Sequence, residues 1–344
     1  MKKILIFVTT FLLIFSLAGC SKKTEEKLYK DLKKKVENSK GYEIEGQLEL
    51  VNNEDVYNYD VIVNYKKDNF YKVSLTNKSN NKEQIILRNT DGVYVVTPSL
   101  NKSFKFQSDW PNNNSQIYLL QSIVNDLNND NTKEVEKKDN YYIYTSNVNY
   151  PNNDNLKKQK VYLDKNGNLK QVEVVDKNNV VMMRLVYKDV DLKANFSKDR
   201  FSLDQLIDVK EESSTSEEEK NKEKEEATTS LEDIVYPLYL PDGTKLTNEE
   251  TVKTEDGKRV ILTFGGEKSF ILVEEAVSKE QEFTVIPTMG EPYMFTDTVG
   301  ALSDSSITFT SSGVDYYITS TTMKQSELLE VAKSISLVPI MKQK

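Results

Sequence analysis

The sequence predicts an α+β protein in which a long antiparallel sheet is followed by a smaller α+β unit. From Tyr42 onward, apolar and polar residues alternate with a period of two, which is typical of strands with one buried face. The gaps between these runs are too short for crossover helices and contain the turn dipeptides Asp91-Gly92 and Asn166-Gly167, so neighbouring strands are expected to be antiparallel.

The N-terminus predicts a lipoprotein signal. Two lysines precede an apolar run at residues 4–15, which is too short for a transmembrane helix of about 20 residues. Residues 17–20, Leu-Ala-Gly-Cys, match the lipobox of bacterial lipoproteins, in which the cysteine takes a diacylglycerol and becomes the new N-terminus. We therefore expect a signal peptide at residues 1–19, lipidation at Cys20 and a lipidated tether at residues 20–27. The alternative is an ordinary signal peptide with an incidental cysteine.

This N-terminus predicts a location at the cell membrane, lipid-anchored on the extracytoplasmic face. Loss of the signal removes two lysines and moves the formal charge from −8 to −10. An acidic mature chain argues against nucleic acid as a partner. Abundant lysine and asparagine with few arginines, together with a lipobox and no other cysteine, favour a Gram-positive cell envelope.

The residue inventory disfavours catalysis. The sequence contains no histidine, and its one cysteine is Cys20, so Ser-His-Asp triads, Cys-His pairs and imidazole metal sites are excluded. No P-loop, GxGxxG or EF-hand spacing is present. We expect no catalytic residues, no cofactor and no metal. An enzyme that uses two carboxylates stays open, although no pair among the acidic residues stands out.

An amphipathic helix is expected before the first strand, because Leu28, Leu32 and Val36 recur at a spacing of four residues. Gly41 is expected to end this helix. One long meander is the expected topology of the sheet. Its strands are expected at residues 42–51, 59–65, 71–75, 85–87, 93–96, 103–106, 141–144, 160–163, 169–175 and 181–187.

One helix is expected to interrupt the meander after Trp110-Pro111 and three asparagines. Ser115 is the expected N-cap. The apolar residues recur at helical spacing and form a wide face: Ile117, Leu119, Leu120, Ile123, Val124 and Leu127. Two interpretations stay open, a helix that plugs the open end of the sheet and a mobile lid over a ligand cavity.

Residues 208–229 contain almost no apolar side chains, so a charged disordered linker is expected there. Beyond it, residues 230–344 are expected to form a C-terminal α+β domain that ends in a helix capped by Ser326. Its strands are expected at residues 260–264, 269–273, 283–286, 306–309 and 316–319.

An N-terminal helix, a long antiparallel meander and a helix inserted after Trp-Pro resemble the LolA/LolB lipoprotein-carrier superfamily. The segments Asn89–Pro111 and Tyr118–Leu127 are similar to those of Gram-positive, sporulation-type LolA-like membrane lipoproteins. The resemblance covers Leu28–Leu203 and implies a LolA-like domain at residues 28–207. The C-terminal part is similar to a domain of unknown function.

The resemblance implies a curved open antiparallel sheet, an incomplete barrel, wrapped around an apolar cavity and covered by helices. Because this chain keeps its own lipid anchor, the ferrying of lipoproteins is not carried over. The expected function is that of a non-catalytic interaction or regulatory protein of the cell envelope, in sporulation or germination, with an envelope protein as partner. The alternative is binding of an acyl chain in the concavity. The residues expected to form that cavity or its lid, or else a filled core, are Ile44, Leu48, Val61, Val63, Trp110, Leu119 and Leu120.

Overall fold

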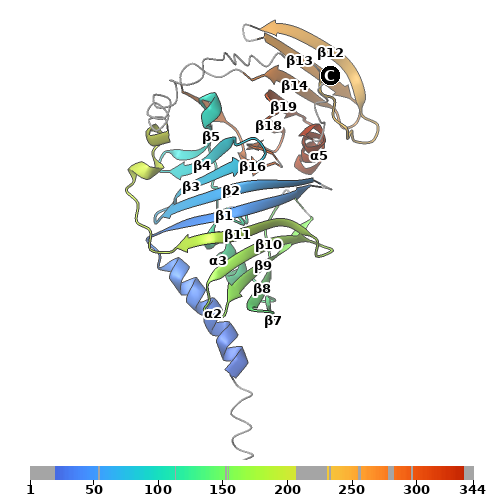
Figure 1. Cartoon of the computed structure of the whole chain (residues 1–344). Coiled ribbons are helices and arrows are strands. Elements are labelled where there is room, and N and C mark those ends of the chain that lie inside the picture. The colour runs from blue at the N-terminus through green and yellow to red at the C-terminus, as the bar shows by residue number, and fades with distance from the viewer. Residues whose placement is uncertain are drawn as a thin grey trace, which may run out of the picture.

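The computed structural model describes residues 20–52, 55–112, 114–151, 153, 155–206, 231, 234–254, 257–277, 283–295 and 297–336. These residues form two open sheets and a few helices (Figure 1), which confirms the expected α+β class and the curved open sheet.

The larger sheet has twelve strands in the order β15-β6-β5-β4-β3-β2-β1-β11-β10-β9-β8-β7. Both edges are open, so the sheet is an incomplete barrel. All pairs except β15 with β6 are antiparallel. The strands are β1 (Gly41–Asn52), β2 (Asp55–Lys66), β3 (Phe70–Asn77), β4 (Glu83–Asn89), β5 (Gly92–Thr97), β6 (Lys102–Phe106), β7 (Glu134–Lys138), β8 (Tyr141–Asn147), β9 (Leu156–Asp164), β10 (Leu169–Asp176), β11 (Val181–Asp191) and β15 (Thr284–Thr288).

The expectation of a single meander was wrong. The chain makes one meander from β1 to β6, crosses to the far edge, and makes a second meander from β7 to β11. The two meanders join where β1 pairs with β11, with Leu48 opposite Leu185. The crossing segment contains helix α3 (Leu120–Asn129). A helix in the connection allows β7 to begin at the opposite edge, which a short turn between neighbouring strands cannot do.

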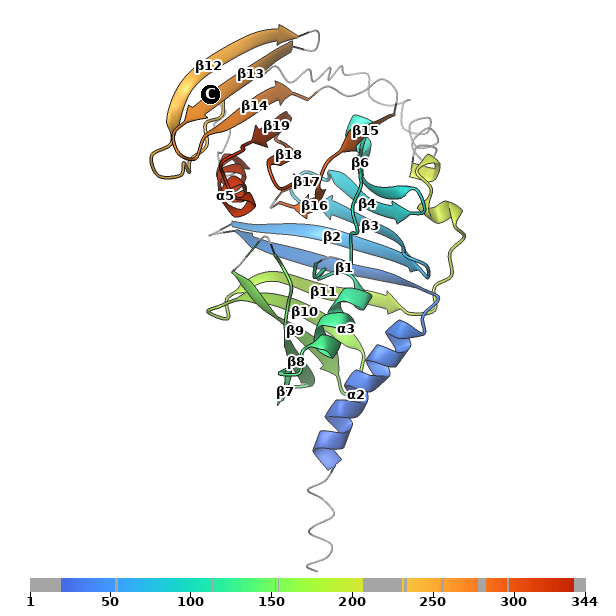
Figure 2. The same ribbon diagram turned by 180° about the vertical axis from the view of Figure 1, so that it is seen from behind.

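Helices α2 (Cys20–Glu37) and α3 lie on the same face of this sheet (Figure 2). The expected stripe of Leu28, Leu32 and Val36 is buried against the concave side. The helix ends at Glu37, so Gly41 does not end it and instead opens β1. A Cβ atom at Gly41 would lie 2.6 Å from the carbonyl oxygen of Ala194, so glycine is needed there for close backbone approach.

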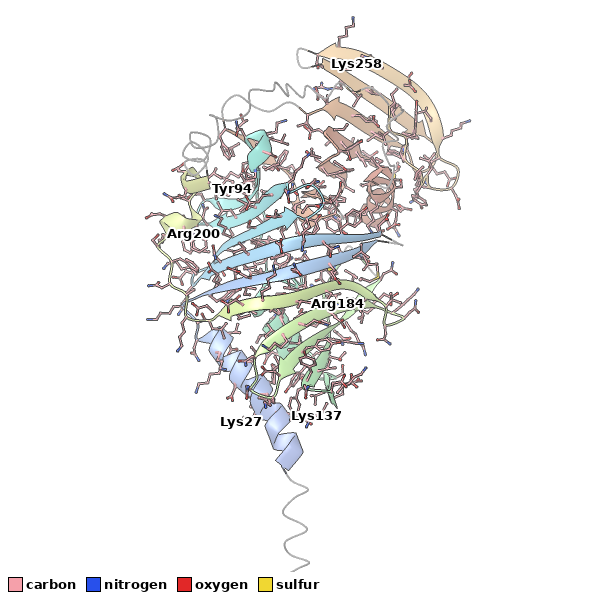
Figure 3. All side chains as sticks on the ribbon, in the orientation of Figure 1. Lys27, Tyr94, Lys137, Arg184, Arg200 and Lys258 are labelled. Carbon is pink, nitrogen blue, oxygen red and sulfur yellow. The ribbon has the colours of Figure 1, made fainter. Side chains whose placement is uncertain are left out.

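The opposite face of the large sheet is covered over β3–β5 and mixed elsewhere, with charged side chains beside the exposed Ile62 and Val186. The short helix η2 (Asp199–Phe201) places the fully buried Phe201 against Phe70 on β3. Farther along the same face, Arg184 (Figure 3) contacts Glu173 at 3.0 Å and Glu49 at 2.9 Å. These ion pairs link β1, β10 and β11 on the outer face.

The smaller sheet has seven strands in the order β12-β13-β14-β19-β18-β17-β16, and helix α5 (Gln325–Ser336) packs on one face. Its strands are β12 (Lys245–Thr254), β13 (Gly257–Gly265), β14 (Phe270–Ala276), β16 (Glu291–Met294), β17 (Val299–Leu302), β18 (Ser306–Ser311) and β19 (Val314–Thr319). The expected α+β character of this part is confirmed.

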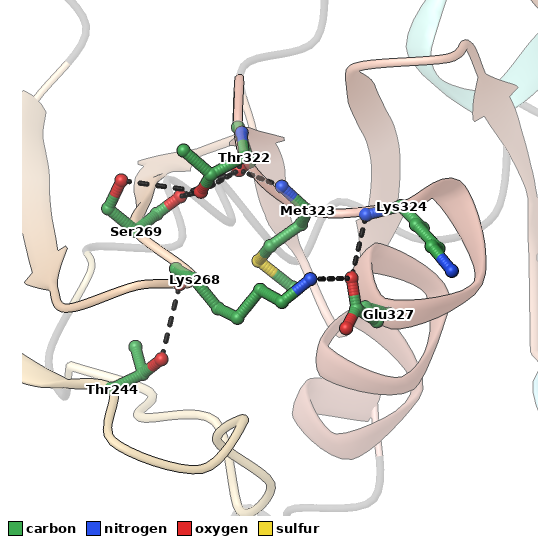
Figure 4. Close-up of polar contacts among 8 residues, drawn as sticks. Thr244, Lys268, Ser269, Thr322, Met323, Lys324 and Glu327 are labelled. Atoms are coloured by element: carbon green, nitrogen blue, oxygen red, sulfur yellow. Dashed lines mark hydrogen bonds and ion pairs between the residues drawn. The ribbon is translucent and has the colours of Figure 1, made fainter.

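The expected cap of the last helix was wrong. The helix begins at Gln325, so Ser326 lies within its first turn. The Glu327 carboxylate takes the capping role by accepting the backbone N–H of Lys324 at 2.8 Å (Figure 4). Lys268 also donates to Glu327 at 3.0 Å and thereby ties the helix to the start of β14. A carboxylate near a helix N-terminus is favourable because it faces the positive end of the helix dipole.

The two sheets are joined by β15 and by side chains. Strand β15 adds to the edge of the large sheet, with Val285 opposite Ser103 of β6. Gln84 on β4 contacts the backbone of Val299 on β17. The expected domain boundaries, 28–207 and 230–344 around a linker at 208–229, stay a prediction, because residues 207–230 lie outside the described residues.

A polar cavity beside helix α3

The seven residues expected to form an apolar cavity meet in one buried cluster. Each is at most 1% exposed, and all belong to the core between the large sheet, α2 and α3. They are Ile44, Leu48, Val61, Val63, Trp110, Leu119 and Leu120. Binding of an acyl chain among them stays a prediction.

A cavity of about 770 Å³ lies beside α3, and we call it the α3 cavity. It is bounded by the end of α2, by residues 111, 112, 114 and 115, by the outer side of α3 and by the end of β8. Of the seven expected residues, Leu119 alone lines it. The other lining residues are Val36, Glu37, Tyr71, Pro111, Asn112, Asn114, Ser115, Gln121, Ser122, Val124, Asn125, Asp126, Asn128, Asn129, Asp130, Asn147, Val148 and Asn149.

Ser115 shapes the wall of this cavity and does not cap the helix. Its backbone N–H donates to the Asn149 carbonyl at 2.8 Å, and its Oγ accepts the Asn149 N–H at 2.8 Å. Helix α3 begins only at Leu120, and its N-cap residue, Leu119, makes no side-chain cap. The expected Ser115 cap was therefore wrong, because a partner distant in sequence takes its hydrogen bonds.

The floor of the cavity continues into a row of aromatic rings across β1, β2 and β3. The rings of Tyr42 and Tyr65 stack with centroids 4.8 Å apart, and Tyr71 follows at 5.1 Å from Tyr65. Trp110 meets the Tyr71 ring edge-on at 6.0 Å. These ring contacts hold the Tyr71 side chain where the buried core borders the cavity.

Gln121 connects this row to the cavity. Its Oε1 accepts the Tyr42 hydroxyl at 2.6 Å. Among the described residues, its Nε2 has no hydrogen bond of normal geometry, although the atom is buried. Burial raises the pKa of Tyr65, and the neighbouring Gln121 amide partly offsets that rise. The Gln121 amide therefore lies between Tyr42 and Tyr65 at the inner wall of the cavity.

Two carboxylates of the cavity have opposite environments. Burial raises the pKa of Asp126 to about 6, and a hydrogen bond with Ser115 partly offsets the rise. Hydrogen bonds from the Thr132 hydroxyl and the Asn147 backbone lower the pKa of Asp130. The residues described as lining the cavity include three acids, with Glu37 the third, and neither lysine nor arginine.

The described residues contain no group of acids or cysteines placed to hold a metal ion. Cys20 is the first residue of α2, and its lipidation stays a prediction. None of the described helices is both long enough and apolar enough to cross a membrane.

Comparison with known proteins identifies the family. The family described as "Sporulation protein YdcC-like" matches residues 1–201. Sporulation protein YdcC of Bacillus subtilis (strain 168) is 35% identical over 335 residues, which is 97% of each chain. The LolA superfamily protein NE2245 from Nitrosomonas europaea is 13% identical with a TM-score of 0.29, covering 51% of this chain and 98% of that one. A chain of the Pseudomonas aeruginosa MucA/MucB complex is 11% identical with a TM-score of 0.32, covering 90% and 97%. The expected sporulation-type resemblance is thus confirmed, and the chain belongs to the YdcC-like family of sporulation proteins.

Proposed function

We propose that this protein is a lipid-anchored, extracytoplasmic protein of the cell envelope that acts in sporulation by binding a partner protein and not by catalysis. Its relationship to a sporulation protein over 97% of both chains supports the process. The signal sequence and Cys20 support the location.

One observation favours the binding of a partner protein over the binding of an acyl chain. The seven concave residues are buried at 1% exposure or less and fill the space under α2 and α3 with their own side chains. Protein interiors packed in this way leave little room for a ligand. The accessible α3 cavity, in contrast, is walled mainly by polar side chains, which suit a polar partner.

Crosslinking in sporulating and growing cells, followed by purification of the full-length protein, tests this function. We expect a specific envelope protein to be recovered from sporulating cells. The Cys20→Ala variant serves as a location control. It is expected to leave the membrane fraction with an unchanged melting temperature, because the buried core begins at Leu28. Recovery of no specific partner from sporulating cells contradicts the proposal, and membrane retention of Cys20→Ala contradicts the anchor.

A second candidate function, binding of an acyl chain, is favoured by a smaller cavity under α2. This cavity of about 240 Å³ is lined by Leu32, Leu120, Leu169 and Leu192 together with charged side chains, namely Lys35, Lys170, Lys188 and Asp189. It lies below the range of about 300–1,000 Å³ usual for ligand sites, so α2 would have to move outward. Titration of the delipidated protein with a fluorescent fatty acid tests this, and Leu32→Trp, which fills the cavity, is expected to abolish saturable binding. Absence of saturable binding to the wild-type protein removes the acyl-chain function.

A further inference from the structure

We propose that the α3 cavity is a binding site for a neutral oligosaccharide, held by amide side chains above an apolar floor. This goes beyond the proposed function, which concerns a protein partner. The site is built from three parts of the chain that are distant in sequence, namely residues 111, 112, 114 and 115, helix α3 and the end of β8.

The charge of the cavity selects against anionic ligands. Its described lining contains Glu37, Asp126 and Asp130 without a lysine or arginine, so a phosphate or carboxylate would meet like charge. A neutral polar molecule meets no such repulsion.

The polar groups of the wall match hydroxyl groups. Amide side chains donate and accept at the same time, as neighbouring sugar hydroxyls do. They reach the cavity from all three parts of the site: Asn112, Asn114, Gln121, Asn125, Asn147 and Asn149.

The floor and the size of the cavity complete the argument. Tyr71, Pro111 and Leu119 are buried lining residues, so the floor beneath the amides is apolar. The volume of about 770 Å³ falls within the range of about 300–1,000 Å³ of small-molecule sites.

Titration of the full-length protein in detergent with chitotetraose, a neutral tetramer of N-acetylglucosamine, tests the proposal by calorimetry and NMR. We expect saturable binding with a Kd at or below about 1 mM. The side-chain amide signals of Asn125 and Asn129 are expected to shift during the titration, because both amides are exposed and line the cavity.

The double variant Asn125→Ala/Asn129→Ala is expected to weaken binding by at least about fivefold, which corresponds to the loss of one net hydrogen bond of about 1 kcal/mol. Alanine favours a helix more than asparagine does, so α3 is expected to stay folded. Asn58→Ala on β2, an exposed asparagine outside the cavity, is the matched control and should bind like the wild type.

Two results overturn the proposal. One is the absence of saturable chitotetraose binding to the wild type, and the other is equal binding by the double variant and the control. A parallel titration with tetra-alanine tests a peptide ligand, and binding of the peptide without the sugar also overturns it. None of these results depends on recovery of the protein partner, so the two proposals fail separately.

Discussion

Removal of the Gln84 side chain is expected to loosen the smaller sheet from the larger one. Its Oε1 accepts the Val299 N–H at 2.6 Å and the Thr298 hydroxyl at 3.2 Å, and its Nε2 donates to the Val299 carbonyl at 3.1 Å. Val299 is 5% exposed and belongs to the core of the larger sheet. One amide therefore pairs both backbone groups of a buried residue on β17.

The size of the effect follows from these bonds. Gln84→Ala leaves the N–H and the carbonyl of Val299 without their partner, and each net hydrogen bond contributes about 1 kcal/mol. We expect the free energy of unfolding to fall by about 2 kcal/mol. With a urea m-value of about 2 kcal/mol/M, the midpoint of unfolding should move down by about 1 M.

Urea unfolding and amide hydrogen exchange test this prediction. The exchange of the Val299 amide should accelerate in Gln84→Ala while the amides of β1 and β2 keep their protection. Gln47→Ala is the matched control, because Gln47 makes a single side-chain bond of 3.3 Å to Asp60 on the same sheet. If both variants shift the midpoint equally, Gln84 does not hold the two sheets together.

Three further changes test other parts of the structure. Because burial raises the pKa of Asp126 to about 6, the folded state binds more protons than the unfolded state between about pH 4 and 6, so wild-type stability should fall with rising pH there. In Asp126→Asn, the fall in the free energy of unfolding between pH 4 and pH 7 should be smaller by about 1–3 kcal/mol, as measured by thermal unfolding at the two pH values. An unchanged dependence on pH would contradict the raised pKa of Asp126. Gly46→Ala places a Cβ 2.7 Å from the Val186 carbonyl oxygen at the junction of the two meanders, so the free energy of unfolding measured in urea should fall by about 1–3 kcal/mol. An unchanged value would mean that β1 and β11 separate easily. Leu48→Ala should lower the free energy of unfolding by about 2–5 kcal/mol in the same assay, because the side chain is fully buried. A neutral result would show an unfilled concavity.

The sequence predicted the elements whose burial follows their periodicity. Strand β2 keeps alternate residues buried from Tyr59 to Val63, and the stripe on α2 is buried as expected. Strands β7 and β12 were missed, because nearly every residue in them is exposed and neither shows apolar alternation. These edge strands form by backbone hydrogen bonding to a neighbouring strand, and such bonding leaves no pattern in the sequence.

The sequence missed the α3 cavity for a related reason. Its walls come from segments that meet only after the chain has crossed from β6 to β7, so no local spacing joins them. The signal that was present is the run of three asparagines after Pro111, of which Asn112 and Asn114 line the cavity. Taken alone, that run predicts only a loop.

The composition of α3 gives an independent reason to regard the cavity as selected for binding. The polar side of this ten-residue helix carries Gln121, Ser122, Asp126 and asparagines, although asparagine, serine and aspartate favour a helix less than lysine or glutamate do. Helix α2 of the same chain has many lysines and glutamates and no asparagine, so a general bias toward asparagine does not explain the difference. A helix that needed only solubility would be more stable with charged residues on its outer side. The departure from local preference occurs where the cavity lies, and such departures are expected at functional sites.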